Sequence, residues 1–261
     1  MKKICLSLKN ICRKMIGIPR MIYSYKDYLK FISQARNFRN LGGVITHYQP
    51  IISEWSAQAG SASGHYFHQD LLVANFIFEN KPFRHIDIAS RVDGFVAHVA
   101  SFRAIEVMDV RDLKSTGHKN ISFIKANLME SNQEQKNITD SISCLHAIEH
   151  FGLGRYGDPI DPNGYIKGFN NIISLLKDDG MLYISFPISS SNKVYFNAHR
   201  VFEPSDIFNW AGPNTALKLE RFDYVDDEGS LHQNAQIKNI NFDLNYGCGI
   251  YSFRKMKSLA L

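Results

Sequence analysis

The chain has 261 residues, of which 44% are hydrophobic and 21% are charged. This composition is ordinary for a protein with a buried core, and the length suits one large α/β domain. The four cysteines are widely spaced and form no Cys-x-x-Cys pair, which argues against a disulfide framework or a cysteine zinc site. They are Cys5, Cys12, Cys144 and Cys248. We therefore expect a reducing, cytoplasmic location.

The net charge of +5 is unevenly distributed. Residues 1–40 contain ten Lys or Arg and one acidic residue, Asp27, which gives +9. The remaining residues contain 20 basic and 24 acidic side chains, which gives −4. A basic arm on a mildly acidic domain differs from the uniform positive charge of a nucleic-acid-binding domain, so no nucleic-acid partner is expected.

The first 18 residues show neither a secretion signal nor a membrane span. Lys9, Arg13 and Lys14 interrupt the apolar stretch, and no run of about 18 apolar residues occurs anywhere in the chain. Apolar residues recur in steps of four and three, which predicts an amphipathic helix that ends before Pro19. They are Ile4, Leu8, Ile11, Met15 and Ile18. The stripe either packs on this domain or on a second subunit, or binds the inner face of a membrane peripherally.

The next segments predict a helical arm followed by a linker. Residues 20–47 read as a helix and a turn at Leu41-Gly42-Gly43, and residues 53–64 are small and polar. We therefore assign residues 1–64 to a basic arm and linker, and residues 65–261 to the main domain. The main domain opens with His65, His68, Gln69 and Asp70, before an apolar helical segment at residues 71–78. This polar cluster either covers a cofactor pocket or is a solvated helix start.

From residue 83, short apolar runs alternate with helical segments. This pattern predicts right-handed βαβ units in a Rossmann-like, doubly wound and mostly parallel sheet. A final pair of strands, residues 217–225 and 246–254, is expected to be antiparallel. The other predicted strands are residues 84–89, 105–110, 121–125, 141–146 and 181–186, and the helices are residues 92–102 and 164–176.

Polar residues stand at the ends of the predicted strands, where open α/β sheets bind their ligands. Asp87 closes the first strand, Asp109 closes the second strand 22 residues later, and Asn127 follows the third. An acid about 20 residues after the first turn is typical of ribose binding. A His146-x-x-Glu149-His150 stretch follows the fourth strand.

In this order, residues 83–205 resemble the successive motifs of class I S-adenosylmethionine (SAM)-dependent methyltransferases. The resemblance implies that SAM is the cofactor, that Asp109 holds its ribose and that Asn127 meets its adenine. It also implies cofactor contacts from five further residues, which are Asp87, Ala89, Arg91, Gly94 and His146.

The turn after the first strand departs from the family pattern. Where the family has several glycines, this chain has Ala89-Ser90-Arg91-Val92-Asp93-Gly94. Glycine allows close approach of a ligand to the backbone, whereas Arg91 adds bulk and charge. The missing glycines favour an alternative, in which the domain is non-catalytic or binds another nucleotide.

Residues 85–103 and 145–169 also resemble a bacterial family of unknown function associated with cell-surface polysaccharide genes. This resemblance implies methylation of a hydroxyl on a sugar or a nucleotide-linked sugar. A histidine would then serve as general base. The candidates are His146, His150 and His199.

The loop at residues 152–162, rich in glycine and proline, is interpreted as a substrate lid. We expect Arg155 and Arg200 to bind an anionic group, and Asp158 and Asp161 to bind hydroxyls. Glu149 is expected to frame the substrate pocket. The alternative is that the loop is only a structural connection.

His146-x-x-Glu149-His150 also matches the signature of inverted zinc proteases. Such short motifs are often fortuitous, so we expect no metal site. A metal-dependent hydrolase stays an alternative that would require bound zinc.

Overall fold

A computed structural model describes residues 25–130, 136–212, 217–237 and 243–257. The apolar stripe between residues 4 and 18 lies outside these described residues. The chain divides into two compact units, residues 1–61 and 62–261. Within the described ranges, no helix is both long enough and apolar enough to cross a membrane.

The smaller unit contains helix α2 (Tyr25–Asn40) and a short 3-10 turn, η1 (Ser53–Ser56). No residue of α2 is buried. Aromatic contacts connect the helix to the segment that follows it, because Lys30 Nζ lies 4.3 Å from the centre of the Trp55 ring and the rings of Phe31 and Tyr48 meet edge to face. Interactions of this kind contribute little at exposed sites, so this unit is held mainly by local contacts.

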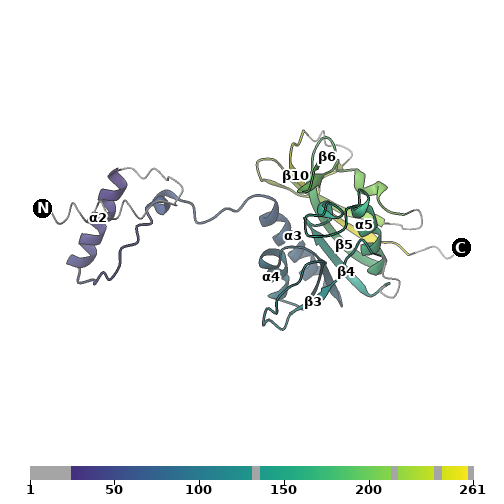
Figure 1. The fold of residues 1–261 in the computed structure, drawn as a ribbon, viewed down its shortest axis with the longest axis horizontal. Coiled ribbons are helices and arrows are strands. Elements are labelled where there is room, and N and C mark those ends of the chain that lie inside the picture. The colour runs from purple at the N-terminus through teal and green to yellow at the C-terminus, as the bar shows by residue number, and fades with distance from the viewer. Residues whose placement is uncertain (1–24, 131–135, 213–216, 238–242, 258–261) are drawn as a thin grey trace. The chain divides into compact units, whose positions relative to one another are not determined.

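The larger unit is built on a mixed sheet (Figure 1). Among the described residues, its eight strands lie in the order β3-β2-β1-β4-β5-β10-β8-β9. The first five are parallel, and β10 runs antiparallel to both β5 and β8. The strands are β1 (His85–Ile88), β2 (Ile105–Asp109), β3 (Ile121–Lys125), β4 (Thr139–Leu145), β5 (Leu176–Ile188), β8 (Leu217–Val225), β9 (Leu231–His232) and β10 (Gly247–Lys255). The predicted Rossmann-like sheet with antiparallel C-terminal strands is confirmed.

Helices cover both faces of this sheet. Successive side chains of a strand point to opposite faces, and here they enter two separate cores. Ile86 and Ile88 pack in the core that contains α5 (Gly164–Leu175), whereas Ile105 and Val107 pack in the core that contains α3 (His65–Asn80). A turn of π-helix, η2 (Val92–Val96), continues directly into α4 (Ala97–Ala100) and joins the second core.

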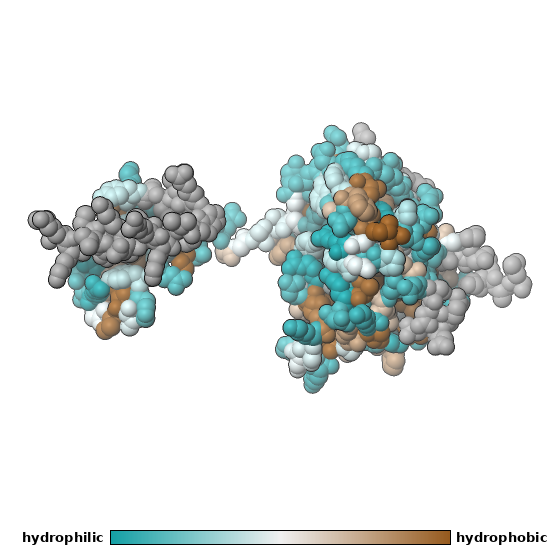
Figure 2. Space-filling view, viewed as in Figure 1, coloured by the Kyte–Doolittle hydropathy of each residue, from teal (hydrophilic) through white to brown (hydrophobic). Residues whose placement is uncertain are grey.

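Burial on both faces explains why the central strands are apolar runs rather than alternating patterns. All four residues of β1 are buried, and so are the last five of β4. The visible surface of the larger unit is mostly hydrophilic, with hydrophobic groups showing between polar ones (Figure 2). The apolar runs that predicted the strands therefore mark the two cores.

Several short elements depart from the predicted pattern. A hairpin of β6 (Lys193–Tyr195) and β7 (His199–Val201) follows β5, and 3-10 turns lie at η3 (Ile148–His150) and η4 (Asp206–Asn209). Strand β6 lacks the burial that produces an apolar signal, because Val194 is 63% exposed, and β7 is too short to show a period. Strand β5 begins at Leu176, ahead of the predicted start, and includes Asp179 in a left-handed conformation with φ of 63°.

A group of aromatic rings fills the core beside α5. The Phe186 side chain is fully buried, and its ring contacts the rings of Phe202, Trp210 and Tyr251 at centroid distances of 5.0 to 5.3 Å. Aromatic pairs of this kind stabilise a fold beyond their buried area.

We expect Phe186→Ala to lower the free energy of unfolding by about 3–5 kcal/mol, because it leaves a cavity among these rings. Phe83→Ala provides a matched control, since Phe83 is 92% exposed and should change stability by less than about 0.5 kcal/mol. Urea denaturation followed by circular dichroism measures both. Equal losses for the two variants would contradict this description of the core.

Candidate functional site

The turn after β1 is fixed by a buried carboxylate. Asp87 is completely buried, and it accepts hydrogen bonds from Ser90 N at 3.0 Å, Ser90 Oγ at 2.6 Å and Ser143 Oγ at 2.6 Å. Ser90 Oγ in turn accepts a hydrogen bond from Leu145 N at 3.0 Å. One side chain therefore connects the turn after β1 to the end of the neighbouring β4.

The same network fixes a buried histidine below the turn. Because Ser143 donates its proton to Asp87, its oxygen accepts from His85 Nε2 at 3.1 Å, which leaves His85 Nδ1 to accept from Ser141 Oγ at 2.8 Å. Burial lowers the pKa of His85 to about 3. His85 is therefore a neutral, structural member of the network.

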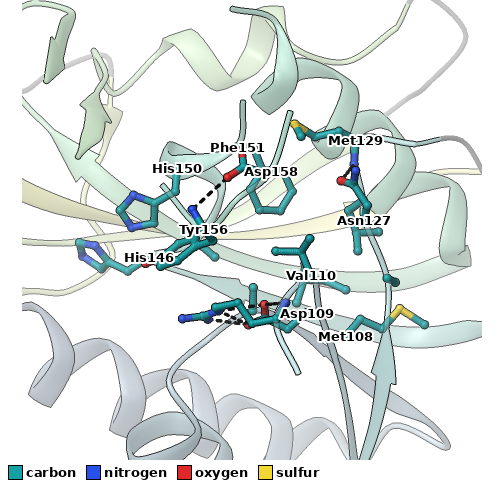
Figure 3. A pocket seen from close by; sticks show the side chains of 16 residues that line it. Met108, Asp109, Val110, Asn127, Met129, His146, His150, Phe151, Tyr156 and Asp158 are labelled. Atoms are coloured by element: carbon teal, nitrogen blue, oxygen red, sulfur yellow. Dashed lines mark hydrogen bonds and ion pairs between the residues drawn. The ribbon is translucent and has the colours of Figure 1, made fainter. Parts of the chain in front are cut away.

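A pocket opens at the carboxyl ends of the parallel strands (Figure 3). It lies where the strand order reverses, which is where open α/β sheets bind their ligands. Asp109 and Asn127 approach from strand ends, and His146 and His150 stand at another side (Figure 3). The lining comprises Ile88 and Ala89 at the end of β1, residues 108–111 at the end of β2, residues 126–129 after β3, His146, Ala147, His150 and Phe151 after β4, and Tyr156 and Asp158.

Two residues of the lining have left-handed backbone conformations. Ala89 has φ of 57° and His146 has φ of 50°. A residue other than glycine is strained in this region by about 1 kcal/mol or more, and such strain is concentrated at functional sites. Ala89 therefore makes the turn for which the family pattern uses glycine, and its backbone N–H is held by Met108 O at 2.9 Å.

Asp109 stands at the end of β2 and is 8% exposed. Its carboxylate accepts hydrogen bonds from Arg111 N at 2.8 Å and from the Arg111 guanidinium at 2.5 to 3.2 Å. The guanidinium also lies over the Tyr156 ring, 4.3 Å from its centre. A ligand that uses the Asp109 carboxylate must therefore share it with Arg111 or displace Arg111.

Asn127 lines the pocket at the end of β3. Its Oδ1 accepts from Met129 N at 3.1 Å, and its Nδ2 donates to Glu130 Oε1 at 2.8 Å. These bonds hold the segment after β3 in a turn. The pocket wall here is otherwise apolar, with Ala126, Leu128 and Met129 facing the space.

A buried acid lies between two histidines after β4. Glu149 is 1% exposed, and its Oε1 lies 3.1 Å from His146 Nδ1 and 3.6 Å from His150 Nε2. Burial alone would lower the pKa of His146, but Cys248 and Glu149 beside it raise that pKa well above its usual value. Two buried atoms of this group, His146 Nε2 and Glu149 Oε2, have no hydrogen-bond partner. Buried polar atoms without partners are rare, and strain, a catalytic role, or an ordered water or ion accounts for them.

This arrangement is not that of an inverted zinc protease. Residues 148–150 form a 3-10 turn, and His146 precedes it in a left-handed conformation, so the two histidines do not lie one helical turn apart. The Glu149 carboxylate occupies the position between their rings. The geometry gives no support to the metal-dependent hydrolase alternative.

The predicted lid is held by its own polar side chains. Asp158 accepts hydrogen bonds from the backbone of Gly152, Gly154 and Tyr156. Arg200 is 5% exposed and donates to Phe151 O at 2.7 Å and Pro162 O at 3.3 Å. These hydrogen bonds hold the loop at the pocket edge.

Arg155 and Asp161 also have partners within the chain. Arg155 Nη1 donates to Ala198 O at 2.9 Å, and Asp161 pairs with Lys167 at 2.6 Å. Substrate contacts by these residues, and by Asp158 and Arg200, stay predictions.

The remaining predicted residues are spread around the site. Asp87 and Gly94 are not in the pocket lining; a Cβ at Gly94 would lie 2.7 Å from Asp70 Oδ2, which explains a glycine there. Arg91 points away to Asp93, at 2.9 Å, and lies over the Tyr66 ring. Arg91 therefore does not obstruct the pocket.

His199 is part of the β6–β7 hairpin, beside the rings of Tyr195 and Tyr246.

Sequence reasoning missed Arg111 and Tyr156, which cover Asp109. The signal for Arg111 was its place two residues after the acid, where a side chain can return to the same carboxylate. Nothing in the sequence placed Tyr156 against it, because that contact depends on the path of the loop after β4.

Comparison with known proteins agrees with the fold. A model of a family described as Caenorhabditis protein of unknown function, DUF268, matches residues 91–209. No curated protein matches the sequence. The structure of the [4+2]-cyclase SpnF is similar at 11% identity, with 88% of this chain and 95% of that chain covered and a TM-score of 0.51. At this identity the similarity shows the fold alone.

Two further solved structures cover most of the chain. One is Burkholderia thailandensis 1,6-didemethyltoxoflavin-N1-methyltransferase, at 12% identity over 92% of this chain and 94% of that chain, with a TM-score of 0.48. The other is an S-adenosylmethionine-dependent methyltransferase from Clostridium acetobutylicum, at 12% identity over 86% of this chain and all of that chain, with a TM-score of 0.48.

The buried Asp87 should make stability depend on pH. Burial raises its pKa from 3.8 to about 6, although hydrogen bonds from Ser143 and Ser90 oppose this shift. Between these values the folded protein holds the proton more tightly than the unfolded chain, so stability falls as pH rises. We expect wild type to lose up to about 3 kcal/mol relative to Asp87→Asn between about pH 4 and pH 6.

Urea denaturation of both proteins across this pH range gives the difference directly. Asp112→Asn is the control, because Asp112 is a solvent-exposed aspartate. A wild-type-minus-variant difference that stays constant with pH would contradict the buried, proton-binding state of Asp87.

Proposed function

We propose that this protein is a SAM-dependent methyltransferase. The observation that carries the proposal is the pocket at the ends of β1 to β4, with the Asp109 carboxylate after β2 and the Asn127 side chain after β3. Both lie where the resemblance to class I methyltransferases requires a ribose ligand and an adenine neighbour. The fold alone does not give an activity, since the same fold serves different chemistries.

The residues present fit such a cofactor. The left-handed Ala89 brings the backbone of the turn to the pocket without glycine, and Asp109 offers a carboxylate to a pair of hydroxyls. Apolar side chains after β3 suit a flat adenine ring. Asn127 can exchange one hydrogen bond of its side-chain amide for one to that ring. Bound SAM supplies an electrophilic methyl group on a positively charged sulfur.

The chain's own residues would hold the acceptor in line with that methyl group and exclude water, which is where most of the acceleration of such a displacement arises. Of the three candidate bases, His146 has a raised pKa and is the least suited to accept a proton. Burial lowers the pKa of both His150 and His199, so each is neutral near pH 7. His150 Nδ1 donates to Ala198 O at 2.7 Å, and its remaining nitrogen, Nε2, faces the Glu149 carboxylate at 3.6 Å rather than an open position, which favours His199 as the base.

We propose a hydroxyl of a sugar or nucleotide-linked sugar as the acceptor. Exposed aromatic residues beside His199, including Tyr195 and Phe196, form a surface suited to a sugar ring. Arg155 and Arg200 stand at the same rim, where an anionic group of the acceptor could be attracted. The acceptor oxygen would form its bond to the methyl carbon as the carbon–sulfur bond breaks, and its proton would pass to His199.

A second candidate function is binding of a different nucleotide without methyl transfer. It is favoured by one observation, the Arg111 guanidinium on the Asp109 carboxylate. In Rossmann-like domains an arginine at this strand end accommodates a phosphate on the ribose. The two candidates predict different ligands for the same pocket.

Calorimetric titration with SAM and with S-adenosylhomocysteine tests the cofactor. We expect wild type to bind and Asp109→Ala to lose roughly ten- to hundredfold in affinity, because hydrogen bonds to a charged group contribute about 1.5–3 kcal/mol. Asp112→Ala is the matched control and should bind as wild type, since Asp112 is 79% exposed at its side chain and pairs with Lys125. Absence of binding to folded wild type, with binding of a nucleotide phosphate instead, would replace the first proposal by the second.

Transfer of labelled methyl groups to a panel of nucleotide-linked sugars tests the acceptor. With an accepted substrate, we expect His199→Gln to lower kcat by about a hundredfold or more at unchanged affinity for S-adenosylhomocysteine. His98→Gln, an exposed histidine on α4, should leave kcat unchanged. SAM binding without transfer to any sugar of the panel would refute the acceptor but not the cofactor.

A further inference from the structure

Three possible metal ligands from distant parts of the chain meet beside the pocket. They are His65 at the start of α3, His146 after β4 and Cys248 in β10. One ring nitrogen from each histidine and Cys248 Sγ all lie within 4.8 Å of one another. Cys248 is fully buried, and the rings of His65 and His146 are stacked at a centroid distance of 5.2 Å.

An unpartnered nitrogen points to a ligand at this place. His146 Nδ1 is occupied by Glu149 Oε1, which leaves Nε2 as the nitrogen available to the cluster. This Nε2 is buried and makes no hydrogen bond of ordinary geometry, although Cys248 lies beside it, and the His146 side chain is only 5% exposed. An unsatisfied buried polar atom is unfavourable, and a bound ion would satisfy it.

The surroundings of the two histidines resemble the outer shell of a metal centre. Histidines that bind metals usually donate their second N–H to a carboxylate or a backbone carbonyl, which fixes the ring and its tautomer. His146 faces the Glu149 carboxylate at 3.1 Å, and the ring of His65 bonds to the backbone of Tyr246. The His146 ring is therefore held with Nδ1 occupied and Nε2 left for the cluster.

We propose that His65, His146 and Cys248 bind a zinc ion. Two imidazoles and one thiolate are the ligands that zinc prefers, and three protein ligands leave a fourth position open, as in catalytic rather than structural zinc sites. This site differs from the one considered for the His146-x-x-Glu149-His150 motif, because it uses neither Glu149 nor His150 as a ligand. It replaces the expectation of no metal, which was based on sequence spacing.

The zinc ion would lie at the wall of the pocket, since His146 is part of the lining. Its open position could hold an oxygen of the acceptor, a role that rests on the proposed methyl transfer. A bound hydroxyl oxygen would lose its proton more readily, as zinc-bound water does. The ion itself is proposed independently of the cofactor.

Metal content and cobalt absorption test the site in the full chain. For this test, Cys5→Ser and Cys12→Ser are introduced into the full chain, so that Cys144 and Cys248 are its only thiols. We expect about one zinc ion per chain after dialysis against metal-free buffer. After exchange to Co²⁺, we expect a near-ultraviolet band from a thiolate bound to cobalt.

Paired variants separate the site from the fold. Cys248→Ser should abolish the thiolate band, and His65→Ala should weaken zinc binding at least tenfold, in the range typical for altered metal sites. Cys144→Ser and His98→Ala should retain both band and affinity; Cys144 is the other buried cysteine of the described chain. Because His65 is only half-buried, His65→Ala tests the site even where Cys248→Ser fails to fold.

Wild type that retains no zinc and shows no thiolate band would overturn the proposal and leave a thiol–imidazole contact without an ion. The proposal would also be wrong if Cys144→Ser lost the band and Cys248→Ser kept it. Titration with S-adenosylhomocysteine keeps the two proposals apart, since Cys248→Ser should bind it as wild type. Wild type that binds S-adenosylhomocysteine but holds no zinc would refute the metal site and leave the proposed cofactor untouched.

Discussion

The pocket depends on a carboxylate that is not part of its lining. Asp87 collects hydrogen bonds from Ser90 and Ser143, and Ser90 holds the end of β4 through Leu145 N. Strand β1 pairs in parallel with β2 and β4. Together with this pairing, the network fixes the positions of the carboxyl ends of the three strands. The left-handed turn at Ala89 follows from it, and so does the space between Asp109 and His146. A buried charge is costly, which is why so many donors surround it.

The sequence predicted the strand positions well because burial on both faces produces apolar runs. The place of Asp109 and Asn127 also followed from the pattern, since the carboxyl ends of parallel strands lie along one edge. The hairpin of β6 and β7 could not be predicted, because its exposed residues show no period. The conformation of Ala89 was also out of reach, because tertiary hydrogen bonds impose it against the local preference of alanine.

Contacts between distant segments account for the rest of the site. His65, His146 and Cys248 have no common motif, and only the insertion of β10 beside β5 brings the cysteine near the two histidines. The sequence spacing instead drew attention to His146 and His150, whose rings the structure places on either side of Glu149. Arg200, which sequence reasoning assigned to an anion, donates to the carbonyls of the loop, and its contact with an anionic group stays a prediction.

The Asp109–Arg111 pair has a consequence for how ligands enter. The chain neutralises its own pocket carboxylate, with a guanidinium that rests on Tyr156. Recognition at Asp109 is therefore an exchange of partners rather than the capture of an isolated charge. The carboxylate needs no ligand to be tolerated during folding, and a ligand adds less to stability than it would at an uncompensated acid. Selectivity then rests on the difference between two sets of hydrogen bonds, because a compound must outcompete an arginine that is already in place.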